Sequence, residues 1–140
     1  MPHVFEYAVL RAVPRVERGE FVNVGVLLYC APLDFLRAKT FVDAARVRAL
    51  DPAVDVELLE ELLGHLGSSC DGAAEAGPVS ATTRGQRFRW LTAPRSTVIQ
   101  TSPTHTGFTD DPEAEVNRLL AALVLPPVTK VATSPLEPRL

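Results

Sequence analysis

The sequence predicts an α+β fold, in which helices pack on one face of a small antiparallel sheet. Up to residue 42, apolar and polar residues alternate in runs separated by turn residues, which is typical of strands. After residue 42, apolar residues recur at helical spacing, and a short β-branched run at Ser96–Ser102 interrupts them. The expected sheet is therefore an N-terminal three-strand meander plus a later strand.

Three strands are expected in the first part of the chain. Val4–Val13 alternates and ends at Pro14, which cannot donate to a strand ladder. Phe21–Cys30 is nearly continuous in apolar residues, as in a central strand that is covered on one or both faces. Phe35–Val42 alternates again, which indicates a strand with one partly solvated face.

Two helices should follow. Asp43–Leu50 is expected to form a short helix, and Asp51 with Pro52 suits the N-cap and first turn of a longer one. Gly67 is a suitable C-cap for that helix. Its apolar stripe consists of Leu58, Leu59, Leu62, Leu63 and Leu66. The Gly/Ser/Ala-rich segment Ser68–Pro78 is expected to be a mobile loop.

The second half of the chain predicts a further strand and further helical segments. Thr83–Thr92 has an apolar side and an arginine side, and Ala93-Pro94 ends it. Ser96–Ser102 predicts the fourth strand, and Thr104–Thr109 is a polar segment with a glycine hinge. Asp111 should cap a last helix over Pro112–Val124.

Length and composition predict one domain. The 140 residues are 46% hydrophobic and 22% charged, which allows a sizeable core over residues 3–125 and a disordered tail over residues 126–140. The net charge of -3 gives no general attraction for nucleic acid. No apolar run approaches the roughly 18 residues that span a bilayer, and the N-terminus lacks the basic region of a signal peptide. We therefore expect a cytoplasmic protein with no membrane segment.

The cysteines and histidines predict no metal or cofactor. Cys30 and Cys70 lack a CxxC spacing, which favours reduced thiols. His3, His65 and His105 are scattered, so a dedicated zinc site is not expected.

A polar residue inside an apolar strand marks the first candidate site. Asn23 lies in the otherwise apolar strand Phe21–Cys30, where a buried amide costs free energy unless it is hydrogen-bonded. Asn23 could satisfy backbone groups in a tight bend, or it could face a pocket. Arg11 and Glu20 should lie at the same end of the hairpin, where an Arg–Glu pair could orient a ligand or clamp the turn.

A second candidate site follows Arg95. An arginine beside serine and threonine hydroxyls can hold a phosphate or carboxylate, although a solvated edge strand would have the same composition. The hypothetical ligand site consists of Arg11, Glu20, Asn23, Arg95, Ser96 and His105. Ser96 or Ser102 with His105 and Glu20 would supply the residue types of a catalytic triad. No GxSxG elbow accompanies them, so we assign no catalytic residue.

A third candidate is an interface around the only tryptophan. Arg87, Phe88 and Trp90 interleave cations with aromatic rings, which suits either nucleic acid or a protein partner. The acidic net charge argues against nucleic acid, and Trp90 could instead anchor the core. We therefore expect a partner interface at these residues.

Three segments carry a family resemblance. YAVLRAVP at Tyr7–Pro14, RGEFVNVGVLL at Arg18–Leu28 and the stretch Arg87–Gly107, followed by Asp110-Asp111-Pro112, resemble the bacterial domain-of-unknown-function family 3037 (DUF3037). The likeness covers nearly all of residues 3–125. It implies a small cytosolic bacterial protein, often encoded beside a HipA-like kinase protein, and it implies no established activity.

These observations favour a non-enzymatic interaction module that acts with a HipA-like kinase. The alternative is a protein or enzyme that binds a small phosphate-bearing ligand in a pocket around Glu20, Asn23, Arg95 and Ser96. The sequence leaves the strand order and the oligomeric state open.

Overall fold

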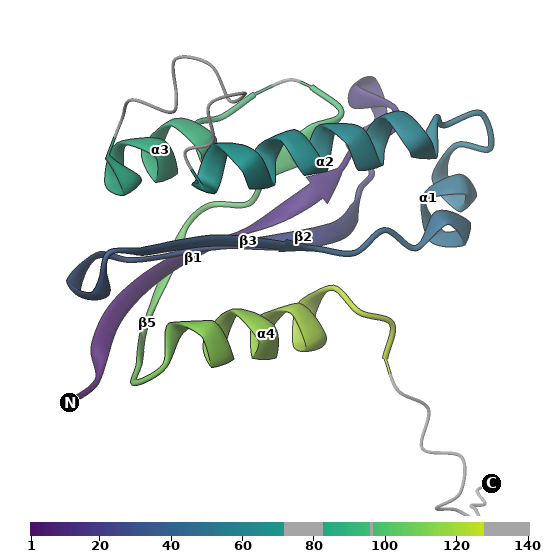
Figure 1. Cartoon of the computed structure of the whole chain (residues 1–140). Helices are drawn as coiled ribbons and strands as arrows, with labels where there is room; N and C mark the ends of the chain where they lie inside the picture. Colours follow the sequence, from purple (N-terminus) through teal and green to yellow (C-terminus); the bar gives the residue numbers. More distant parts are fainter. Residues whose placement is uncertain (72–82, 96, 128–140) are drawn as a thin grey trace, which may run out of the picture.

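A five-stranded antiparallel sheet forms the centre of the molecule (Figure 1). The structure is a computed structural model that describes residues 1–71, 83–95 and 97–127. The strand order is β3-β2-β1-β4, and β5 also pairs with β1. The strands are β1 (His3–Ala12), β2 (Val22–Cys30), β3 (Phe35–Thr40), β4 (Ile99–Thr101) and β5 (His105–Thr109).

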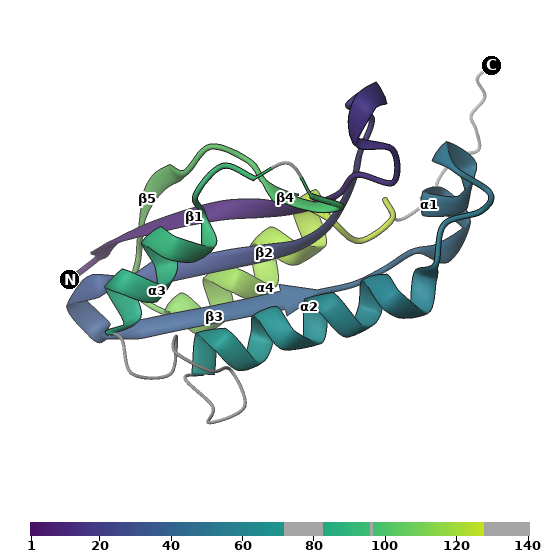
Figure 2. The same cartoon turned by 90° about the horizontal axis from the view of Figure 1, so that it is seen from above.

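Strand β1 organises the sheet because it has neighbours on both sides. One side pairs with β2 along most of its length, and the other pairs with β4 at residues 10–12 and with β5 at residues 3–7. Between β4 and β5, Ser102 exchanges bonds with Val9: its backbone N–H donates to the Val9 carbonyl (2.9 Å), and its Oγ accepts from the Val9 N–H (2.8 Å). The segment 99–109 therefore follows β1 as one interrupted edge strand (Figure 2).

Helices cover both faces of the sheet (Figure 1). Helices α2 and α3 lie on one face, which we call the upper face, and α4 lies on the lower face. The helices are α1 (Ala44–Leu50), α2 (Val56–Asp71), α3 (Arg84–Leu91) and α4 (Pro112–Leu123), and two short 3-10 turns occupy Val16–Arg18 and Ala31–Leu33.

The α+β class and the antiparallel sheet are confirmed, but the expectation that all helices share one face is wrong. The reason lies in β2, whose two faces are both apolar. Val24 and Leu27 belong to the upper cluster with α2 and α3, whereas Val26 and Leu28 belong to the lower cluster with α4. A strand of this kind must be covered twice, because either face left open would expose large apolar side chains.

The consecutive upper-face residues Val24 and Gly25 form a β-bulge in β2. Leu10 pairs with Gly25 and the next residue of β1, Arg11, pairs with Asn23, so Val24 is the extra residue. A Cβ on Gly25 would lie 2.8 Å from the Lys39 carbonyl oxygen and 2.9 Å from Leu10 Cδ1. The close approach of the strands at the bulge therefore requires glycine.

Two predicted helix boundaries need correction. Asp51 ends α1, its N–H donating to the Val47 carbonyl (3.2 Å), and Asp55 is the residue that caps α2 by accepting from the Leu58 N–H (3.0 Å). Gly67 does not end α2, which continues to Asp71. The last turns are helical because they bury Cys70 on the same helix face as Leu63.

Other predicted elements hold with small shifts. Thr83 caps α3 through a capping box, and Asp111 caps α4 by accepting from the Ala114 N–H (3.2 Å). The predicted glycine hinge at Thr104–Thr109 is instead strand β5, which forms against β1 as an exposed edge. Residues 72–78 of the predicted loop and residues 128–140 of the predicted tail lie outside the described residues.

Candidate functional site

The amide of Asn23 joins the sheet to the end of α4. Its Nδ2 donates to the carbonyl oxygen of Leu123, the last residue of that helix, at 3.0 Å. The last carbonyls of a helix have no partner inside the helix, so this bond satisfies one of them. The half-buried Asn23 thus bonds a backbone group, as one of the two roles left open by the sequence requires, but the group lies at the end of a distant helix and not in a tight bend.

The expected pair of Arg11 and Glu20 does not form. Arg11 faces Asn23 across the strands, and its guanidinium carbon lies 4.2 Å from the centre of the Phe21 ring. Glu20 accepts instead from Arg18 Nε at 2.7 Å, and this bond lowers the pKa of the exposed Glu20 carboxyl. Glu20 therefore pairs with Arg18, which is only two residues away in the sequence, and not with Arg11.

Arg95 and His105, two further residues of the hypothetical ligand site, do not lie beside Asn23. Arg95 is on the upper face, where it contacts Trp90 and lines a hollow with α2, whereas Asn23 bonds α4 on the lower face. His105 lies on β5, with its ring centre 5.2 Å from that of Tyr7. Ser96 lies outside the described residues. Asn23 and Arg95 thus do not share one pocket, since the sheet separates them.

The predicted partner interface divides between core and surface. Phe88 is completely buried and stacks on Tyr29, with 5.4 Å between the ring centres, and Arg87 is also buried. Trp90 is 53% exposed. Because α3 packs on the sheet through Phe88, the tryptophan two residues later points away from the sheet, so Trp90 remains available to a partner.

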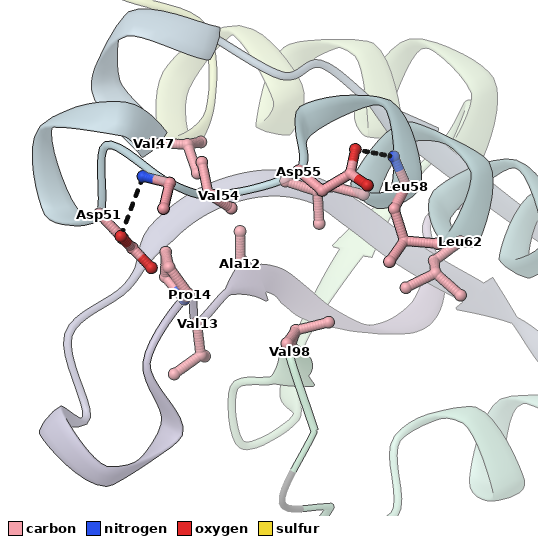
Figure 3. A pocket seen from close by; sticks show the side chains of 12 residues that line it. Ala12, Val13, Pro14, Val47, Asp51, Val54, Asp55, Leu58, Leu62 and Val98 are labelled. Carbon is pink, nitrogen blue, oxygen red and sulfur yellow. Dashed lines mark hydrogen bonds between the residues drawn. The ribbon is translucent and has the colours of Figure 1, made fainter.

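Trp90 stands at one end of an apolar groove that runs along α2. A hollow of about 440 Å³ lies beside Trp90 and Arg95, and a second of about 240 Å³ lies toward α1 (Figure 3). The two hollows adjoin, because Leu62 and Val98 line both. In Figure 3, Leu58 and Leu62 of α2 lie on one side of the second hollow, opposite the segment of Val13 and Pro14.

Large apolar side chains are exposed along this groove. The exposed fractions are 47% for Leu58, 36% for Leu62, 39% for Val98 and 53% for Trp90. They come from α2, from α3 and from the segment before β4, so the fold gathers them from three parts of the chain. We call the surface formed by these four residues and Arg95 the α2 groove.

The sequence predicted roles for Trp90 and Arg95 at the end of the α2 groove but none for its leucines. All five leucines of α2 were expected to form one apolar stripe, but only Leu59 and Leu63 are buried, whereas Leu58 and Leu62 are exposed. Neighbouring residues of a helix point about 100° apart, so leucine pairs at consecutive positions make a stripe wider than one sheet can cover. The doubled leucines were the signal for a second apolar surface.

Two carboxylates of the second hollow hold backbone groups. Asp51 accepts from the Ala53 N–H (3.1 Å) and Asp55 from the Leu58 N–H (3.0 Å), so both carboxylates already hold backbone groups (Figure 3). The described part of the chain has no group of three or more His, Cys, Asp or Glu side chains that could hold a metal. Within the same residues, no helix is long and apolar enough to cross a membrane.

Comparisons with known proteins agree with the resemblance seen in the sequence. A family model described as a protein of unknown function (DUF3037) matches residues 7–124, which include every strand but the start of β1 and all four helices. Neither the curated proteins nor the solved structures gave a match. The match covers most of the chain, and the protein therefore belongs to the DUF3037 family.

Proposed function

We propose that this protein is a non-enzymatic protein-interaction module and that the α2 groove is its contact surface. The observation that carries the proposal is the exposure of Leu58, Leu62, Trp90 and Val98 side by side. Soluble monomers seldom leave a contiguous apolar surface of this kind uncovered unless it binds something. Tryptophan and arginine are also the residues that most often contribute large binding energies at protein interfaces.

We propose a HipA-like kinase as the partner, in a bacterial cytoplasm. Support for this choice comes from the family resemblance, which implies that the two genes are often neighbours. The partner would place apolar side chains on Leu58, Leu62 and Val98 and pack against the exposed ring of Trp90. The pocket alternative has less support, because Asn23 and Arg95 lie on opposite faces of the sheet.

Titration of the full chain with the HipA-like kinase by isothermal calorimetry tests the proposal. Leu62→Glu places a charge in the α2 groove and should weaken binding at least about tenfold, because desolvating a carboxylate in an apolar interface is costly. Phe108→Glu is the matched control, since Phe108 is 73% exposed on β5 and lies outside the groove. Equal affinities for the two variants, or no heat of binding with the wild-type protein, would contradict the proposal.

A further inference from the structure

Arg95 lies within ion-pair distance of no carboxylate among the residues that the structure describes, whereas six other arginines do. The arginines that lie within ion-pair distance of a carboxylate are Arg15, Arg18, Arg37, Arg84, Arg89 and Arg118. Arg95 instead directs its hydrogen bond and its cation–π contact to Trp90. Within the described residues, no carboxylate pairs with its positive charge at the end of the α2 groove.

Trp90 holds the guanidinium of Arg95 in place. The guanidinium carbon lies 4.6 Å from the centre of the tryptophan ring, and Nη2 donates to the Trp90 carbonyl oxygen at 2.6 Å. A guanidinium has five N–H donors, so this bond leaves most of them for a ligand. An arginine that is already oriented loses less conformational entropy when it binds a carboxylate.

The surroundings of Arg95 favour a ligand that is apolar next to its charge. Arg95 lines the hollow of about 440 Å³ together with Leu62, Leu66, Val98 and Ile99. A carboxylate that reaches Arg95 here would lose part of its water, and the ion pair would be stronger than on an open surface.

The charge of α2 limits how acidic that ligand can be. Glu57 and Glu61 are exposed on α2, and each precedes a leucine of the groove. A strongly acidic segment would be repelled along the helix, whereas the hollow at the Trp90 end has no carboxylate in its lining and includes Arg95. The complementary ligand is thus an apolar segment with one acidic residue.

We propose that the α2 groove binds an apolar segment of a partner protein and that one aspartate or glutamate of this segment pairs with Arg95 beside Trp90. This inference rests on the proposed function and adds to it the chemistry of the partner and the orientation of its segment. Arg95 is the residue that determines specificity, and the leucines supply the apolar contact.

Selection of phage-displayed dodecapeptides on the immobilised full chain tests this inference. On the wild-type protein, enriched peptides should combine apolar residues with a single Asp or Glu at a fixed position. On Arg95→Glu, the enriched residue at that position should change to Lys or Arg. Binding of the best wild-type peptide to Arg95→Gln should weaken about ten- to hundredfold, as for the loss of a charged hydrogen bond.

Two further variants separate this inference from the proposed function. Leu62→Glu should abolish enrichment and Phe108→Glu should leave it unchanged, and circular dichroism checks that each variant is folded. If peptides depend on Leu62 but show the same charge preference on wild type and Arg95→Glu, the role of Arg95 is refuted and the groove stands. If no peptide depends on Leu62, both proposals fail.

Discussion

Replacing Asn23 by alanine should destabilise the protein through one hydrogen bond between β2 and α4. The variant loses the donation from Nδ2 to the Leu123 carbonyl, which spans 100 residues of sequence. A neutral hydrogen bond contributes about 0.5–1.5 kcal/mol to the free energy of unfolding, and leaving a buried acceptor without any partner costs more. Because Asn23 is only half-buried and Leu123 is partly exposed, water can reach the carbonyl. We therefore expect a loss of about 1 kcal/mol in the free energy of unfolding.

Urea unfolding measures this loss, and the dependence of the free energy of unfolding on urea concentration should not change. Thermal unfolding should show a decrease of roughly 4 °C in Tm. Asn23→Leu is the informative control, because leucine has the same number and branching of side-chain heavy atoms as asparagine and cannot donate. If the hydrogen bond matters, the leucine variant should be as unstable as the alanine variant. An alanine variant within about 0.3 kcal/mol of wild type, or a leucine variant that regains full stability, would refute the reasoning.

The remaining predictions concern two glycines and one buried cysteine. Gly25→Ala should destabilise the protein by about 1–3 kcal/mol, because its Cβ would press on the Lys39 carbonyl at the bulge. Gly64→Ala should stabilise it by about 0.5–1 kcal/mol, because Gly64 lies inside α2 with open space around it. Urea unfolding measures the free energy of unfolding of both variants. Comparable losses would contradict the bulge argument. Burial raises the pKa of the Cys70 thiol to about 12, so alkylation at pH 8 should require unfolding. Because the pKa of Cys70 is raised in the folded state, the thiol contributes to stability below pH 9 and this contribution is lost as the pH rises toward 12. The free energy of unfolding should therefore decrease over this interval. A rate of alkylation equal to that of free cysteine would contradict the burial of Cys70.

The order and type of most elements could be predicted because local chemistry determines them. Pro14 ends a strand, and Asp111 begins a helix wherever the rest of the chain lies, and both predictions hold. The predicted cap at Asp51 is wrong although it was argued from local chemistry. Two aspartates precede α2, and Asp51 ends α1 and accepts from the Ala53 N–H, whereas Asp55 accepts from the Leu58 N–H and caps α2.

The candidate site could be predicted only in part, because it depends on which face of the sheet each segment covers. The argument that a polar residue inside β2 needs a partner holds, since Asn23 bonds the end of α4. The sequence could not show that α4 and Arg95 lie on opposite faces, which is a property of the chain path. For the same reason Phe88 and Trp90, two residues apart, were both assigned to the surface, and only the packing of α3 separates them.

The position of α4 has a consequence for synthesis of the protein on the ribosome. The lower face of β2, with Val26, Leu28 and Cys30, is covered by a helix that is translated about 80 residues later. Until α4 emerges from the exit tunnel, the nascent sheet carries a bare apolar surface, and the bond from Asn23 has no acceptor. The lower face therefore stays uncovered until α4, the last helix of the described residues, has been synthesised.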